Sequence, residues 1–194
     1  MKKIAFDIDG TVVNLQDSLR YYIKKMYNIE LQDKAFSRWS IEETTNLPYE
    51  QVLACVNVCI EDIVRQEIYP GAEWFIKSYQ SKTKNEVLFV TNRWDMKNTY
   101  RLLDRWFLYT PYQVKFVEGS ILGKGSKVEI LQNEKVDICI EDRIENAEEI
   151  SEAGIFTYLI ERSWNQFGSK GSDKLVRVKD WFELKEMYEK ICED

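Results

Sequence analysis

Two aspartates separated by a single residue follow a short apolar run near the start of the chain. Asp7 and Asp9 come directly after the run from Ile4 to Phe6, and Gly10 permits a tight turn behind them. Because alternate strand residues point the same way, we expect the two carboxylates to converge. Neighbouring carboxylates stay ionised together only beside a counter-charge, and Mg²⁺ prefers oxygen ligands of this kind. An ordinary strand followed by an Asp-Gly turn is the simpler alternative.

Polar side chains also end two later apolar runs. The run 87–90 is followed by Thr91, Asn92 and Arg93, and the run 136–140 is followed by Glu141 and Asp142. Ligands of an open α/β sheet bind beyond the carboxyl ends of its strands. We therefore expect these groups to gather around Asp7 and Asp9.

A lysine precedes the third of these runs. Lys127 begins a helix predicted over 126–134, which places its positive charge close to the carboxylates. Lys124 is the alternative for the same role, and either side chain could instead be an ordinary surface lysine.

The composition excludes several kinds of chemistry. The 194-residue chain has no histidine, so histidine-based triads, zinc sites and general bases are ruled out. Its formal net charge is −6 and no basic block stands out, which argues against binding to polymeric nucleic acid. The start of the chain resembles no signal peptide and no long apolar run follows, so we expect a cytoplasmic protein that does not enter membranes. The sequence leaves open whether the protein forms a homodimer.

The cysteines show no CxxC spacing, and we expect them to be buried, reduced thiols. They are Cys55, Cys59, Cys139 and Cys192.

The apolar spacing divides the chain into two parts. Residues 15–68 are helical in pattern, with a second helix beginning at Pro48. From residue 69 onward, helices near 71–82, 96–107, 126–134, 144–153 and from Asp180 alternate with strands near 87–90, 114–117, 136–140, 155–160 and 174–178. This alternation predicts an α/β fold, a parallel sheet between two layers of helices. We assign 1–14 and 69–194 to a Rossmann-like core and 15–68 to a small helical cap.

The order of these motifs resembles the haloacid dehalogenase superfamily of phosphatases. The resemblance covers nearly the whole chain and is carried by Asp7-Ile8-Asp9-Gly10-Thr11, Thr91, Lys127 and Glu141-Asp142. It implies a Rossmann-like three-layer fold and phosphomonoester hydrolysis through an aspartyl-phosphate.

The same resemblance implies a role for each motif residue. Asp7 would be the nucleophile, and Asp9 would protonate the leaving oxygen and then activate water. Thr91 and Lys127 would bind the phosphoryl group. Asp7, the backbone carbonyl of Asp9 and Asp142 would hold Mg²⁺. Glu141 would support the site or bind the ion through water, although it could instead cap the following helix.

A narrower resemblance points to the 5′(3′)-deoxyribonucleotidases. It rests on the cap position, on Tyr-Pro-Gly-Ala at 69–72 and on Ser-Trp-Asn at 163–165. It implies a nucleoside monophosphate as the small phosphorylated substrate. Most cap aromatics are expected to form the cap's own core, with Phe36 and Trp39 as the exceptions that could stack on a base. Thr11, Asn92 and Arg93 are further candidate substrate contacts, although Arg93 could be a surface arginine.

Two other functional classes remain open at this stage. The first is a phosphatase of the same superfamily for another small phosphomonoester, such as a sugar phosphate or phosphoglycolate. The second is a non-catalytic binding protein on the same fold, which the complete set of motif residues disfavours.

Overall fold

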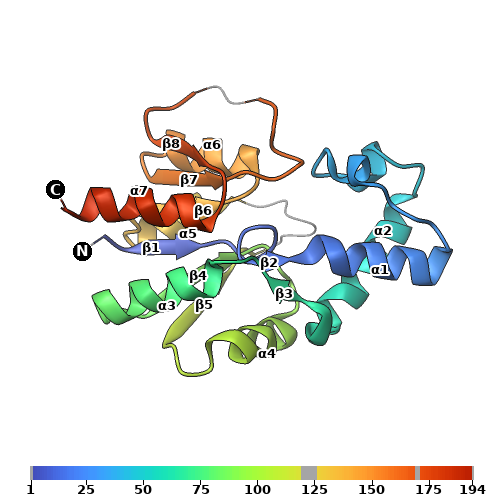
Figure 1. Cartoon of the computed structure of the whole chain (residues 1–194), viewed down its shortest axis with the longest axis horizontal. Helices are drawn as coiled ribbons and strands as arrows, with labels where there is room; N and C mark the ends of the chain where they lie inside the picture. The colour runs from blue at the N-terminus through green and yellow to red at the C-terminus, as the bar shows by residue number, and fades with distance from the viewer. Residues whose placement is uncertain (1, 119–125, 169–170, 194) are drawn as a thin grey trace.

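A six-stranded parallel sheet forms the centre of the molecule (Figure 1). The computed structural model describes residues 2–118, 126–168 and 171–193. The strand order is β5-β4-β1-β6-β7-β8, so the first strand lies in the middle of the sheet. The bounds are Ile4–Phe6 for β1, Val87–Thr91 for β4, Tyr112–Phe116 for β5, Ile138–Glu141 for β6, Phe156–Ile160 for β7 and Leu175–Val178 for β8.

Helices cover both faces of this sheet, as the alternating pattern predicted (Figure 1). Ile4 and Phe6 of β1 pack into one apolar core with α3 (Ala72–Thr83), α4 (Met96–Phe107) and α7 (Trp181–Glu193). Ala5 points to the opposite face, where α5 (Val128–Asn133) and α6 (Ile144–Glu152) contribute to a second core. The strand period of two therefore separates the two layers of helices. The predicted α/β fold is confirmed, and the ends of its helices and strands lie within two residues of the predicted ones.

An insertion follows β1 and projects from one end of the sheet (Figure 1). We define it as residues 13–68: β2 (Val13–Asn14), α1 (Leu15–Tyr27), the 3₁₀ turns η1 (Asp33–Phe36) and η2 (Ile41–Glu43), α2 (Tyr49–Glu61), η3 (Ile63–Arg65) and β3 (Glu67–Ile68). Its two helices pack on each other around a small core of their own, which includes Leu19, Ile23 and Cys59. The division into core and cap domains at the residues given above stays a prediction.

The insertion leaves and rejoins the core through a two-stranded antiparallel ribbon. Val13 pairs with Ile68 and Asn14 with Glu67. This strand at 67–68 falls in a stretch expected to be helical, because two residues are too few to show the alternation that identifies a strand. The ribbon holds the two ends of the insertion side by side.

The three cysteines whose side chains are described, Cys55, Cys59 and Cys139, are buried and free, as expected. In the described part of the chain, no helix combines the length and the apolar character needed to cross a membrane.

Candidate active site

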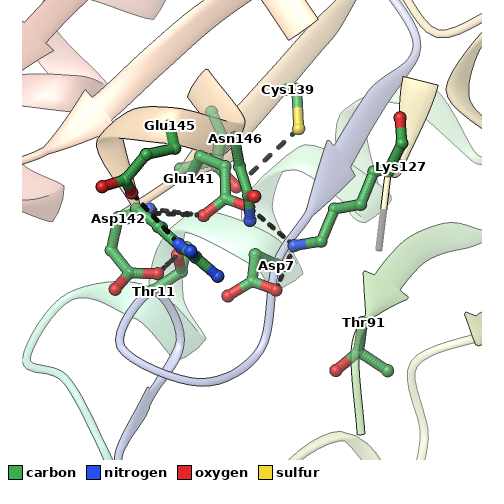
Figure 2. Close-up of polar contacts among 12 residues, drawn as sticks. Asp7, Thr11, Thr91, Lys127, Cys139, Glu141, Asp142, Glu145 and Asn146 are labelled. Carbon is green, nitrogen blue, oxygen red and sulfur yellow. Dashed lines mark hydrogen bonds and ion pairs between the residues drawn. The ribbon is translucent and has the colours of Figure 1, made fainter. Parts of the chain in front are cut away.

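The polar motif residues meet at the carboxyl edge of the sheet, beyond β1 and its two neighbours. β1 pairs with β4 on one side and with β6 on the other. Asp7 therefore lies between Thr91, at the end of β4, and Glu141, at the end of β6 (Figure 2). This arrangement is the one expected from the order of the strands.

Lys127 is the centre of a buried ionic cluster. Its side chain is only 2% exposed, and its ammonium group donates hydrogen bonds to Oδ1 of Asp7 and, at 2.7 Å, to Oε1 of Glu141 (Figure 2). Burial alone would lower the pKa of Lys127, but the charges of Asp7 and Glu141 outweigh it and raise that pKa. Lys127 is thus a permanent cation beside Asp7. Lys124, the alternative lysine, lies outside the described residues.

Glu141 uses both carboxylate oxygens inside the protein. Oε1 accepts from Lys127 and from Nδ2 of Asn146 at 2.7 Å, and Oε2 accepts from the backbone N–H groups of Asp142 at 2.8 Å and Arg143 at 3.1 Å. Burial would raise the pKa of Glu141, but Lys127 and these hydrogen bonds hold it below its usual value. The carboxylate therefore stays ionised and orients Lys127. The two backbone N–H groups that donate to it precede α6, whose N-cap residue is Arg143, so Glu141 does not cap that helix.

Asp142 is fully buried and held by two donors. Its Oδ1 accepts from the hydroxyl of Thr11 at 2.9 Å, and its Oδ2 accepts from Nε1 of Trp164 at 2.9 Å. Nδ2 of Asn165 donates to the backbone carbonyl of Asp142 at 2.6 Å. In the sequence, Trp164 and Asn165 stand out only as part of a family motif. Nothing in the sequence indicates that both donate hydrogen bonds to Asp142, a candidate metal ligand.

The cluster contains three buried carboxyl groups and one buried ammonium group. Carboxylate oxygens of Asp7, Glu141 and Asp142 lie within 4.8 Å of one another, and Lys127 is the cation that pairs with two of them. Burial raises the pKa of Asp7 to about 7 despite Lys127, and burial together with Glu141 and Asp7 raises that of Asp142 well above its usual value. Three buried carboxylates with one ammonium group suit a divalent cation with oxygen ligands. The residues therefore fit Mg²⁺. Each Asp142 oxygen accepts one hydrogen bond, whereas each Glu141 oxygen accepts two, so Asp142 and Asp7 are the carboxylates better able to bind the ion.

Asp9 does not join this cluster. Its carboxylate forms a two-pronged ion pair with Arg93, from Nε to Oδ2 at 2.7 Å and from Nη2 to Oδ1 at 2.6 Å. We expected Asp7 and Asp9 to converge as residues of one strand, but β1 ends at Phe6 and the strand alternation no longer applies beyond it. Arg93 is correspondingly buried, unlike the surface arginine that the sequence left open.

The remaining predicted substrate contacts differ in their access to the site. Thr91 and Asn92 line the cavity described below, whereas Thr11 is buried behind Asp142 and is not among the residues that line it. Arg93 also lines the cavity, and nothing in the described ranges accepts a hydrogen bond from its Nη1. Direct contact of these residues with a substrate stays a prediction.

A cavity of about 480 Å³ separates the cluster from the insertion. Asp7, Asp9, Thr91, Lys127 and Asp142 line its floor, and the insertion supplies an opposite wall that combines apolar and polar residues. The polar wall residues are Gln16, Arg38, Ser40, Glu42, Glu43 and Tyr49. The apolar wall residues are Leu15, Leu19, Phe36, Trp39, Ile41, Val52, Val56 and Ile60.

The two aromatic rings proposed for base stacking lie in different surroundings. Phe36 belongs to the core of the insertion, and the guanidinium of Arg20 covers its ring at 4.4 Å, so its expected exclusion from that core is wrong. Its neighbours in sequence are polar, but the 3₁₀ turn η1 directs its ring inward. Trp39 is half-buried, and its ring packs edge-on against Trp164 with a centroid distance of 6.1 Å. Trp39 is therefore the better placed of the two to meet a ligand.

If the cluster binds Mg²⁺, the ion should stabilise the fold. We expect Mg²⁺ at 100 times its dissociation constant to raise the unfolding free energy by about 2.7 kcal/mol, and EDTA to reverse the rise. Asp142→Ala should lose most of this increment in thermal melts, whereas Glu141→Gln should keep more of it. Glu145→Gln, an exposed carboxylate beside the site, is the matched control and should keep it all. The reverse ranking of Asp142 and Glu141 would show that their roles are exchanged.

Comparison with known proteins gives distant relatives along the whole chain. No protein-family model matches it. It is 24% identical over 186 residues to "Putative nucleotidase YqfW" of Bacillus subtilis (strain 168), a match that covers 94% of this chain and 91% of that protein. It is 24% identical over 202 residues to "Nucleotidase CA_C3379" of Clostridium acetobutylicum, covering 98% of this chain and 95% of that protein.

Solved structures share the architecture at lower identity. A haloacid dehalogenase-like hydrolase, SP0104 from Streptococcus pneumoniae, is 16% identical with a TM-score of 0.64, over 97% of this chain and 98% of that one. CbbY from Rhodobacter sphaeroides, in complex with xylulose-(1,5)-bisphosphate, is 13% identical with a TM-score of 0.65, over 95% and 96%. These likenesses show a haloacid dehalogenase-like α/β fold with an insertion after the first strand.

Proposed function

We propose that this protein is a Mg²⁺-dependent phosphomonoester hydrolase whose substrates are nucleoside monophosphates. The observation that carries the proposal is the buried cluster of Asp7, Lys127, Glu141 and Asp142 at the floor of the cavity. It combines a carboxylate nucleophile, a fixed cation and a site for a divalent ion, which are the groups that phosphoryl transfer requires. The proposed activity agrees with the names of the distant relatives.

In the proposed reaction Asp7 attacks the phosphorus atom. A carboxylate oxygen of Asp7 forms the new P–O bond as the bond to the leaving oxygen breaks. Asp9 enters this step as the protonated acid and gives that oxygen its proton. A water molecule then attacks the phosphorus and gives a proton to Asp9. This step releases inorganic phosphate and restores the Asp7 carboxylate.

The surrounding groups bind the phosphoryl oxygens. Lys127 supplies a positive charge, and the hydroxyl of Thr91 supplies a hydrogen bond. Mg²⁺, held by Asp7, Asp142 and the backbone carbonyl of Asp9, would neutralise part of the phosphoryl charge when bound. Glu141 keeps the Lys127 ammonium group in place through the hydrogen bond described above.

The apolar residues of the cavity wall favour a nucleotide over a sugar phosphate. The hydroxyl groups of a sugar lose hydrogen bonds to water on binding, and apolar side chains do not replace them. A flat base instead gains from contact with aromatic and aliphatic side chains, about 1–3 kcal/mol for each stacked ring. A sugar phosphate is the second candidate, since the similar CbbY structure holds a sugar bisphosphate.

A phosphate-release assay with Mg²⁺ and a panel of phosphomonoesters tests the proposal. We expect pyrimidine deoxynucleoside monophosphates to be hydrolysed with a higher kcat/KM than sugar phosphates and phosphoglycolate. If kcat/KM for nucleotides is no higher than for sugar phosphates, the nucleotidase assignment is overturned. If no compound of the panel releases phosphate, the hydrolase assignment is overturned as well.

Trp39→Ala tests how the base is recognised. If the base stacks on this ring, the variant should lose about 1–3 kcal/mol of transition-state binding for nucleotides and almost none for p-nitrophenyl phosphate. Trp74→Ala, which removes a half-exposed tryptophan on α3, is the matched control and should change neither activity. Equal losses for both substrates would mean that Trp39 acts through the fold of the insertion.

A further inference from the structure

Gln66 is a buried polar side chain that ties the insertion to the sheet. It lies between η3 and β3, where the chain returns to the core, and it is fully buried. Its Nε2 donates to the backbone carbonyls of Cys59 at 2.8 Å and Ile60 at 3.1 Å, in the last turn of α2. Carbonyls in the last turn of a helix have no partner within that helix. A shift of the end of α2 would therefore move the Gln66 amide with it.

The other end of the same amide contacts Arg93. Oε1 of Gln66 accepts a hydrogen bond from Nη2 of Arg93 at 2.6 Å, and the same guanidinium holds Asp9. The Arg93 side chain is only 1% exposed, and a buried cation without its carboxylate would be strongly destabilising. The planar guanidinium fork fixes the orientation of the Asp9 carboxylate.

The backbone of Gln66 is held by a different element. Nε1 of Trp106 and Nη1 of Arg105, both on α4, donate to the Gln66 carbonyl at 3.4 and 3.2 Å. The backbone of this residue therefore stays with the core while its side chain is bound to α2. A displacement of α2 relative to the sheet must stretch or turn the Gln66 amide, and with it the contact to Arg93.

We propose that Gln66 and Arg93 are positioning residues that set the Asp9 carboxylate for proton transfer according to where the end of α2 lies. The inference rests on the proposed function, in which Asp9 protonates the leaving oxygen. It makes the insertion a controller of the proton-transfer step as well as a wall of the cavity. It also requires that a change at Gln66 lowers kcat/KM most for substrates whose leaving oxygen needs a proton.

Comparison of two leaving groups tests this dependence. An alkoxide leaving a nucleoside monophosphate needs a proton, whereas p-nitrophenolate leaves without one. The value of kcat/KM reports the steps up to P–O cleavage, so it isolates the acid role of Asp9. For Gln66→Leu we expect kcat/KM to fall at least about tenfold for the nucleotide and less than about threefold for p-nitrophenyl phosphate. Arg93→Lys keeps the charge without the fork and should show the same selective loss.

The contacts that run from α2 through Gln66 and Arg93 to Asp9 are called the relay below. Two comparisons separate an effect of this relay from general damage to the fold. Tyr112→Phe removes a hydrogen bond to Asp104 of α4 that lies outside these contacts, and it should not change the ratio of the two kcat/KM values. In an Asp9→Asn background, Gln66→Leu should cause no further loss with the nucleotide, because both changes act through one group. Equal losses for the two substrates, or a full additional loss in that background, would overturn the relay. If Gln66→Leu does not fold, the Arg93→Lys comparison decides.

Failure of the relay can be told apart from failure of the proposed function. A wild-type protein that releases no phosphate from either substrate overturns both. A wild-type protein that is active and depends on Asp7, but whose Gln66→Leu variant loses both activities equally, overturns the relay alone.

Discussion

Asp7→Asn should abolish turnover and leave the fold intact. The amide has almost the shape of the carboxylate but cannot form the bond to phosphorus, so we expect kcat to fall by at least about a thousandfold, or ~4 kcal/mol in the barrier. Lys127 would keep Glu141 as its carboxylate partner, which is why the cluster should survive the change. Phosphate release measures the loss, and circular dichroism with thermal melting checks the fold.

Asp137→Asn is the matched control for this substitution. Asp137 precedes β6 at the opposite end of that strand from Glu141, and it accepts a hydrogen bond from the backbone of Lys3. It should leave turnover unchanged. A single turnover with ³²P-labelled substrate, quenched in acid, should leave label on the wild-type protein and none on Asp7→Asn. Activity of Asp7→Asn within about tenfold of wild type would exclude the covalent mechanism.

Lys127→Met should have the largest effect on stability. It removes the ammonium group from a cluster of three buried carboxylates, and loss of one partner from a buried ion pair costs about 3–5 kcal/mol. Urea unfolding without metal should show this loss. Saturating Mg²⁺ should recover part of it, because the ion neutralises the same carboxylates. Phosphate release should also fall, by roughly 10²–10³-fold.

A surface pair provides the control for Lys127. Lys115 pairs with Glu134 at 2.6 Å, and its side chain is 40% exposed. Lys115→Met should therefore cost no more than about 1 kcal/mol. If Lys127→Met costs as little as Lys115→Met, the cluster is not the buried, charge-dependent arrangement described above.

The part of the site that the sequence predicts is the part built on strand ends. Asp7, Thr91 and Glu141 each follow an apolar run, and the carboxyl ends of parallel strands meet at one edge whatever the loops do. Lys127 could be placed for a similar reason, since it precedes the helix that leads into β6. Local pattern and sheet geometry together are sufficient for these positions.

The part that the sequence does not predict depends on side-chain direction in irregular segments. The Asp9–Arg93 pair and its link to Gln66 join three turns that no periodicity describes. Phe36 is another example, because its polar neighbours suggested an exposed loop while a single 3₁₀ turn directs the ring into the insertion core. Local propensity determines that these turns exist, but long-range packing determines which way each side chain points.

The central place of β1 has a consequence for how the chain reaches this structure. Ile4 pairs with Ile138, and Ala5 pairs with both Leu88 and Cys139, so the middle of the sheet joins segments separated by most of the chain. Such non-local pairing slows folding, because a large loop must close before the contact forms. During synthesis at about 5–20 residues per second, the apolar strand at residues 4–6 waits roughly 7 to 26 seconds for β6. In that interval Asp7 has neither Lys127 nor Glu141 beside it, so the proposed active site is complete only after β6 has been synthesised.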